Sequence, residues 1–188
     1  MKNQLICISI ALLTLVACKQ PAAVEESESP DYALFDKNVE VVRSFIKAHS
    51  EENLDAIQAI LSDTLQYSPA DYNGNQWLGK EEFITALKGY HDNFENLKFV
   101  SGIVTADAKV NGFWSGSVFP KETANSDGTN VRSYGTWSAT HTASGKEIGA
   151  KWFALVGVNS DGQIASFSDY FDVNGLAAQI AAQEEVEE

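Results

Sequence analysis

The sequence predicts an α+β fold in which helices pack on the concave face of a curved antiparallel sheet. In residues 34–94 apolar side chains recur with helical spacing, whereas residues 98–171 alternate with a period of two between short turns such as "VNGF", "SDGT" and "ASGK". Hydrophobic residues make up 44% of the 188-residue chain, which is enough for one globular domain with its own core.

Three helices are expected in the first half of the domain. The helix over 34–50 would bury one face, which carries Val39, Val42, Phe45, Ile46 and His49. Asn53 is the expected N-cap of a second helix, whose apolar side chains are Leu54, Ile57, Ile60 and Leu61. A short strand over 65–68 stops at Pro69, and a third helix follows in "GKEEFITALKGYHDNF" (79–94), with an apolar face of Phe83, Ile84, Leu87 and Phe94.

The second half is a meander of strands, which we expect at 98–109, 112–119, 131–143, 147–158 and 163–171. Asp172 directly precedes "VNGLAAQI" and is the expected N-cap of a last helix over 174–183. Residues 184–188, "EEVEE", form an acidic tail. The domain therefore spans 34–183.

The net charge of the chain excludes one class of partner. Thirteen Lys and Arg against 26 Asp and Glu give a formal charge of −13. A surface this acidic repels phosphate backbones, so we expect no binding to nucleic acid.

The N-terminal segment is typical of an export signal. Lys2 precedes an apolar run from Leu5 to Ala17, which is too short for a bilayer core of ~30 Å that needs ~20 helical residues. "LVAC" at 15–18 resembles a bacterial lipobox, and the alternative is an ordinary secretory signal that happens to contain Cys18. The lipobox interpretation predicts that residues 1–17 are a signal peptide, that Cys18 carries the lipid (diacylglycerol plus an N-acyl chain such as palmitate), and that residues 18–33 form a flexible tether.

This interpretation places the protein in the bacterial cell envelope, anchored to a membrane through the lipid on Cys18. Lys19, which follows the cysteine, favours the outer membrane over the inner one.

Three stretches carry a resemblance to a known family: "VVRSFIKAHSEENLDAIQAILSDTLQYSP", "WLGKEEFITALKGYHDNF" and "GQIASFSDYFDVNGLAAQI". Together they resemble the nuclear transport factor 2-like superfamily, and its SnoaL-like branch in particular, over about residues 36–182. The resemblance implies a cone-like α+β barrel. It does not imply one activity, because the superfamily includes isomerases, cyclases, hydrolases, dehydratases and binding domains.

Several common sites are not predicted. "GNQWLGKE" at 74–81 fits GxxxxGK, but Glu81 stands where a phosphate loop needs Ser or Thr, so we expect a loop that leads into a helix. His49, His91 and His141 do not have the spacing of metal ligands, and the only cysteines are Cys7 and Cys18. We therefore expect no metal and no cofactor.

Strand alternation predicts an aromatic pocket on the concave face. In the last strand Phe167 and Asp169 share the more apolar side, which we place inward. The same rule turns Trp137 and His141 to one face of "TWSATH" and turns Trp152 inward, because its neighbour Lys151 belongs outside. The predicted ligand pocket consists of Trp137, Trp152, Phe167 and Tyr67.

Asp169 and His141 are the candidate catalytic residues of this pocket. A carboxylate buried alone costs several kcal/mol unless it finds a partner or a proton, and His141 is the nearest candidate on the same face. The alternatives are a solvated Asp169 at the rim, a structural His141, and tryptophans that only pack the core.

Three functions stay open on these grounds. The first is a membrane-anchored domain that binds a small apolar or amphipathic molecule. The second is a SnoaL-like enzyme of the isomerase, cyclase or hydrolase type, with Asp169 as general acid or base and His141 as its partner. The third, implied by the resemblance, is a homodimeric interaction module that uses the outer face of the sheet.

Overall fold

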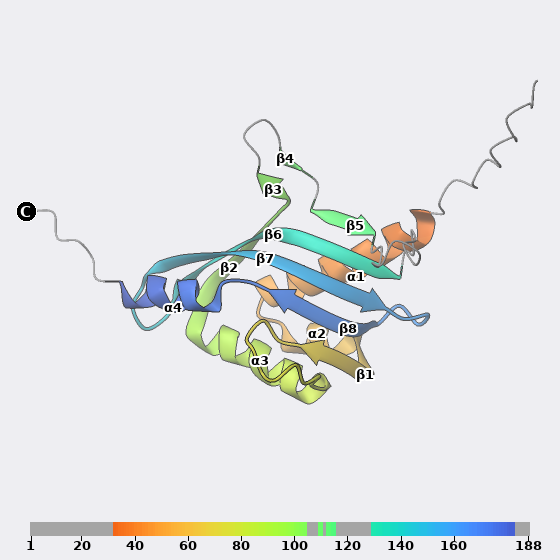
Figure 1. Ribbon diagram of the computed structural model, residues 1–188, viewed down its shortest axis with the longest axis horizontal. Helices are drawn as coiled ribbons and strands as arrows, with labels where there is room; N and C mark the ends of the chain where they lie inside the picture. The colour runs from red at the N-terminus through yellow and green to blue at the C-terminus, as the bar shows by residue number, and fades with distance from the viewer. Residues whose placement is uncertain (1–31, 105–108, 111, 116–128, 183–188) are drawn as a thin grey trace, which may run out of the picture.

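The computed structural model describes residues 32–104, 109–110, 112–115 and 129–182, which fold as four helices on a curved, unclosed six-stranded sheet (Figure 1). The helices are α1 (Tyr32–Ser50), α2 (Leu54–Ile60), α3 (Lys80–Asn93) and α4 (Val173–Ala181). The strands of the sheet are β1 (Leu61–Ser68), β2 (Phe94–Ser101), β5 (Phe113–Ser115), β6 (Asn130–His141), β7 (Glu147–Val158) and β8 (Ile164–Tyr170). A separate pair is formed by β3 (Ile103–Val104) and β4 (Lys109–Val110).

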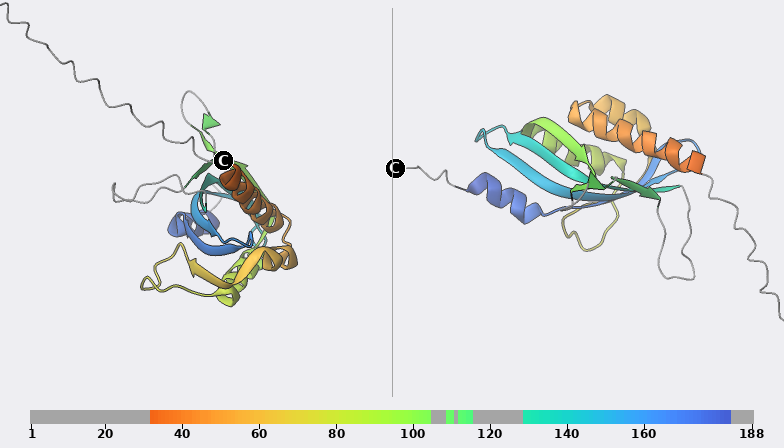
Figure 2. Two further views of the ribbon diagram at one scale, coloured as in Figure 1. Left: turned by 90° about the vertical axis from the view of Figure 1, so that its right-hand side faces the viewer. Right: turned by 90° about the horizontal axis from the view of Figure 1, so that it is seen from above.

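The strand order is β1-β8-β7-β6-β2, and β5 pairs with the first part of β6, at Val131–Ser133. The sequence predicts an antiparallel sheet, but the observed sheet is mixed. Strand β1 lies parallel to β8, with Tyr67 beside Phe167. This arrangement places β1 and β2 at opposite edges, so α3, which joins them in sequence, crosses the hollow side between the two edges (Figures 1 and 2). No tight turn joins the parallel pair, because β1 and β8 are about 100 residues apart in sequence, whereas a tight turn joins only antiparallel strands.

The core lies between the concave face of the sheet and helices α1 and α3. The predicted inner face of α1 is confirmed, because all five of its residues are at most 9% exposed. Phe45 of α1, Phe83 of α3 and Phe167 of β8 meet at the centre, with ring centroids 4.8–5.9 Å apart. Aromatic rings at these separations contribute about 0.5–1.5 kcal/mol per pair beyond the area that they bury.

The predicted helix caps are confirmed. The side chain of Asn53 accepts a hydrogen bond from the Ala56 N–H at the start of α2, and that of Asp172 accepts one from the Gly175 N–H at the start of α4. Each cap supplies an acceptor to an N–H group that has no partner inside its helix.

Several predicted boundaries differ from the structure. Helix α1 begins at Tyr32, two residues before the expected start. The strand expected at 98–109 begins earlier and ends at Ser101, because the chain turns at Gly102, whose φ of 105° favours glycine. Of the strand expected at 112–119, residues 112–115 are described, and Phe113–Ser115 of these form β5.

The predicted signal peptide (1–17), residues 18–31 of the predicted tether and the acidic tail (184–188) lie outside the described residues. Among the helices of the described ranges, none is both long and apolar enough to cross a bilayer.

Candidate functional site

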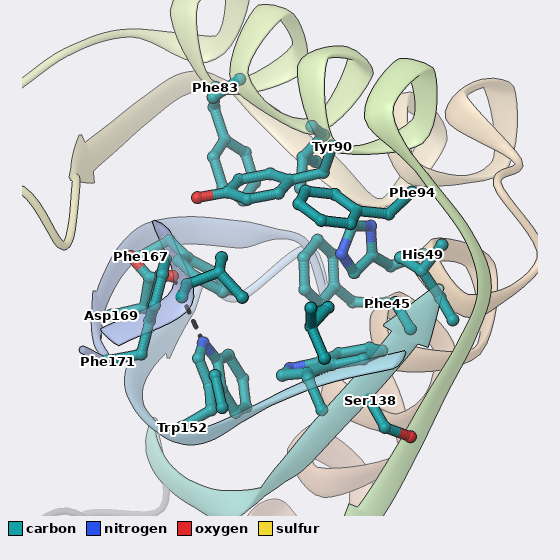
Figure 3. A pocket seen from close by; sticks show the side chains of 18 of the residues that line it. Phe45, His49, Phe83, Tyr90, Phe94, Ser138, Trp152, Phe167, Asp169 and Phe171 are labelled. Carbon is teal, nitrogen blue, oxygen red and sulfur yellow. Dashed lines mark hydrogen bonds between the residues drawn. The ribbon is translucent and has the colours of Figure 1, made fainter. Parts of the chain in front are cut away.

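A cavity opens between the concave face of the sheet and helices α1, α3 and α4 (Figure 3). Its volume is about 100 Å³. Most of the lining is aromatic or aliphatic, and the polar side chains in it are His49, Tyr67, Tyr90, Ser138, Trp137, Trp152 and Asp169. An apolar cavity with a few polar groups is the usual form of a small-molecule site.

The aromatic wall of the cavity is built by β6, β7, β8 and β1. Trp137, Trp152, Phe167 and Tyr67, the four residues predicted as pocket lining, all line the cavity. The indole rings of Trp137 and Trp152 meet edge to face, at 6.2 Å and 81°. The ring centroid of Phe167 lies 6.3 Å from that of Trp152 and 6.4 Å from that of Tyr67.

Asp169 is the acidic residue of the cavity, and its position follows from strand alternation. Phe167 is buried on β8, so the side chain two residues later projects to the same concave face. The indole Nε1–H of Trp152 donates a hydrogen bond to Asp169 Oδ2 at 3.3 Å (Figure 3). The other oxygen, Oδ1, is fully buried and has no hydrogen-bond partner among the described residues.

Burial dominates the electrostatics of this carboxyl group. Removal from water raises the pKa of Asp169 to about 6. The hydrogen bond from Trp152 and a backbone hydrogen bond within Asp169 itself lower this pKa, and the charge of Asp71 adds a smaller upward contribution. The group is thus mostly ionised at pH 7 and can gain or release a proton near neutral pH.

Two tyrosines of the cavity share this environment. Burial and then the charge of Asp169 raise the pKa of Tyr67, and the same two causes raise the pKa of Tyr90 to about 12. Figure 3 shows the ring of Tyr90 extending across the top of the cavity towards the side where Asp169 lies. Both phenols therefore stay protonated and can act as hydrogen-bond donors.

His141 does not lie in this cavity, which corrects the expected pairing with Asp169. It is the last residue of β6, where its Nδ1 lies 2.8 Å from Ser144 Oγ in the following turn and its ring packs on Phe94. Alternation assigns His141 to the inner face correctly, but the strand carries it past the end of the pocket. The partner of Asp169 in the structure is Trp152.

The histidine that does line the cavity is His49, near the end of α1. Its Nδ1 lies 2.8 Å from Nε2 of His91 on α3, and its ring meets Trp137 edge to face at 4.9 Å. Burial and the neighbouring His91 lower the pKa of His49 to about 3, and burial also lowers the pKa of His91. The sequence placed His49 on the buried face of its helix, but it contained no signal for the contact with His91.

Elsewhere the described residues line a second, more open hollow between α1 and β5. They contain no group of three His, Cys, Asp or Glu side chains that could hold a metal ion. Lys80, from the GxxxxGK stretch, donates hydrogen bonds to Leu61 O and Asp63 Oδ1, both at 2.9 Å, and so ties the loop to β1.

Comparison with known proteins gives matches in structure and none in sequence. No protein-family model and no curated protein matches the chain. A protein from Jannaschia sp. CCS1, proposed to be a SnoaL-like polyketide cyclase, aligns over 82% of this chain and 99% of its own, with 16% identity and a TM-score of 0.61. The chain has the SnoaL-like, nuclear transport factor 2-like fold.

Two other solved structures are similar to this chain in fold. A nuclear transport factor 2-like protein of unknown function from Burkholderia pseudomallei K96243 covers 78% of this chain and 98% of its own, at 17% identity and a TM-score of 0.56. An M. tuberculosis LEH-like epoxide hydrolase covers 78% and 90%, at 18% identity and a TM-score of 0.53. At identities this low the structural likeness shows the fold alone, whereas activity depends on the residues of the cavity.

Proposed function

We propose that this SnoaL-like domain binds a small apolar or amphipathic molecule in the aromatic cavity. The observation that carries the proposal is Asp169 Oδ1, a buried carboxylate oxygen without a partner in an otherwise apolar wall. A buried polar atom left unsatisfied costs about 1–3 kcal/mol, and more when it is charged. Oδ1 is out of reach of a water-sized molecule, so a ligand hydroxyl or amine that donates to it requires a small rotation of the Asp169 side chain towards the cavity. The bond then removes this cost and orients the molecule.

The size of the cavity limits the ligand. Its volume of about 100 Å³ is somewhat below the ~150 Å³ of an engineered apolar cavity that binds benzene. We therefore expect a compact ligand of about one ring, or the apolar end of a longer amphipathic molecule whose remainder extends through the opening.

The proposal is tested with benzyl alcohol and toluene, which differ only in the hydroxyl group, in titrations followed by amide NMR at pH 8. We expect benzyl alcohol to bind more tightly than toluene, with the largest shifts around Trp152 and Phe167. Ala86→Leu, on the cavity side of α3, should weaken binding of both, whereas Thr85→Leu, on the exposed side, should not. Binding that is unaffected by Ala86→Leu contradicts the site.

A second candidate is an acid–base enzyme in which Asp169 transfers the proton. It is favoured by the pKa of about 6 for Asp169 and by the two neutral phenols of the cavity, which could stabilise a developing negative charge. This role predicts that Asp169→Asn abolishes turnover of a ligand that still binds. Mass spectrometry of small molecules that co-purify with wild type and variant separates the two candidates, because only an enzyme leaves a chemically changed molecule.

A third candidate is the homodimer, favoured by a row of aromatic side chains on the outer face of the sheet. Tyr134, Phe153 and Tyr170 lie side by side on β6, β7 and β8, with ring centroids 4.6 and 5.8 Å apart. Tyr170 is 57% exposed and Leu155, on the same face, is 39% exposed. Light scattering should give a dimer mass for wild type and a monomer mass for Leu155→Glu; a monomer in both excludes this use of the face.

We further propose that the mature protein is anchored in the bacterial cell envelope by a lipid on Cys18, in the outer membrane rather than the inner one. The support is the "LVAC" sequence at the end of an apolar run. Cells fed a fatty-acid analogue should label the wild type and leave Cys18→Ala unlabelled. Equal labelling of the two proteins contradicts the anchor.

A further inference from the structure

A buried contact between two histidines lies beside the cavity, and one of the two, His49, lines it on the side opposite to Asp169. His49 is 9% exposed, and its ring lies across the cavity from Asp169 in Figure 3. The 2.8 Å contact between His49 Nδ1 and His91 Nε2 requires one proton between these two atoms. Because Nδ1 is engaged with His91, Nε2 is the polar atom that His49 offers to the cavity.

The environment of His91 decides which histidine supplies that proton. His91 Nδ1 is buried and has no hydrogen-bond partner among the described residues. If His49 were the donor, a neutral His91 would carry its own proton on Nδ1, as a buried N–H without an acceptor. If His91 Nε2–H is the donor, Nδ1 is a bare nitrogen instead. A buried N–H donor without an acceptor is rarer in proteins than a buried acceptor atom without a donor, so the second arrangement is favoured. In that arrangement His49 Nδ1 is the acceptor, and the proton of His49 is on Nε2.

We propose that His49 presents an Nε2–H donor to the cavity, and that the ligand therefore carries a hydrogen-bond acceptor such as a carbonyl for His49 and a donor such as a hydroxyl for Asp169, on a small apolar body. His91 is the positioning residue, because it fixes the tautomer of His49 without contact with the ligand. The inference rests on the proposed binding function and adds the chemical class of the ligand. It requires neutral histidines, which agrees with the direction of both pKa shifts: burial and the neighbouring His91 lower the pKa of His49, and burial lowers that of His91 against smaller upward contributions from Glu52, a backbone hydrogen bond with His49, and Asp92.

The tautomer is tested directly in the wild-type protein. Two-bond ¹H–¹⁵N correlation spectra of protein labelled in histidine should show His49 protonated on Nε2, with Nδ1 as a hydrogen-bonded acceptor. His141, which is outside the cavity, provides an internal comparison. A His49 protonated on Nδ1 overturns the inference without any variant.

The ligand class is tested with four probes at pH 8: toluene, benzyl alcohol, and the 3- and 4-isomers of (hydroxymethyl)benzaldehyde. At least one isomer should bind roughly twofold to tenfold more tightly than benzyl alcohol, the range of one hydrogen bond. In His49→Leu, and in His91→Phe, this advantage should fall towards unity while benzyl alcohol still binds better than toluene. In Asp169→Asn the aldehyde should keep its advantage over benzyl alcohol, whereas benzyl alcohol should lose its advantage over toluene.

The outcomes separate the two levels of the proposal. An aldehyde that adds nothing in the wild type, or that keeps its advantage in His49→Leu, overturns the role of His49 and leaves the Asp169 site standing. Benzyl alcohol that binds no better than toluene overturns the proposed site itself, and the further inference with it.

Discussion

Replacing Asp169 by Asn is expected to stabilise the protein at neutral and alkaline pH. The carboxylate is held in an apolar wall, with one oxygen bonded to Trp152 and the other without a partner. The amide has nearly the same shape and can still accept from the indole N–H, but it carries no charge that must be removed from water. A loss of stability is the normal effect of most substitutions, so a gain is a distinctive result.

The magnitude follows from the pKa of the group. The unfolded value of 3.8 rises to about 6 in the folded protein, because burial disfavours the charged form. A raised pKa means that the folded state binds the proton more tightly than the unfolded state does. The contribution of Asp169 to the free energy of unfolding is therefore greatest below pH 3.8 and is lost as the pH rises to about 6. The free energy lost above that pH is about 3 kcal/mol, an upper value for what Asn can recover.

Urea unfolding of wild type and Asp169→Asn across pH measures this difference. The variant should be more stable by up to about 3 kcal/mol at pH 8 and by only about 1 kcal/mol at pH 4.5, since most of the wild-type group is then protonated in the folded state. Asp161→Asn, an exposed position in the turn before β8, is the control and should give no such pH dependence. A variant that is less stable than wild type at pH 8, or a difference that does not change with pH, refutes the reasoning.

Three further predictions concern the hydrogen bond to Asp169, the cap of α2 and the packing at two glycines. Trp152→Phe removes the hydrogen bond that lowers the pKa of Asp169, so ¹³C NMR should show that pKa moving above about 6; an unchanged or lower value contradicts the bond. Asn53→Ala should destabilise α2 by about 1 kcal/mol in urea unfolding, whereas Asn53→Asp, which keeps an acceptor, should not. Gly135→Ala places a Cβ 2.2 Å from a ring carbon on β2 and should cost about 1–3 kcal/mol, while Gly89→Ala, with open space around it, should stabilise α3; equal effects would be inconsistent with this packing.

Local patterns were sufficient to predict most of the fold and one side of the cavity. The inner face of α1, the caps at Asn53 and Asp172, and the inward direction of Asp169 each depend on a few neighbouring residues, which the sequence displays. Alternation gave the face of His141 but not its place in the pocket, because it fixes the face of a strand residue and not its distance along the strand from the pocket.

The features that the sequence could not show depend on how distant elements meet. His49 and His91 are 42 residues apart and come together because α1 and α3 pack on the same face of the sheet. The parallel edge formed by β1 and β8 likewise joins segments about 100 residues apart, and nothing in the short run 61–68 indicates its partner. In both cases the information lies in tertiary packing rather than in periodicity.

In the proposed site, Asp169 Oδ1 accepts a hydrogen bond from the ligand. The most direct test of this claim is the pKa of Asp169 with and without benzyl alcohol, followed by ¹³C NMR of its carboxyl carbon. The free protein should titrate near pH 6, and the complex should titrate at lower pH, because a donor to Oδ1 stabilises the charged form. A free pKa near the ordinary 3.8 shows that the group is solvated at the rim, and a pKa that does not change on binding shows that the ligand does not contact it. Either result contradicts a cavity built around a buried, unsatisfied carboxylate.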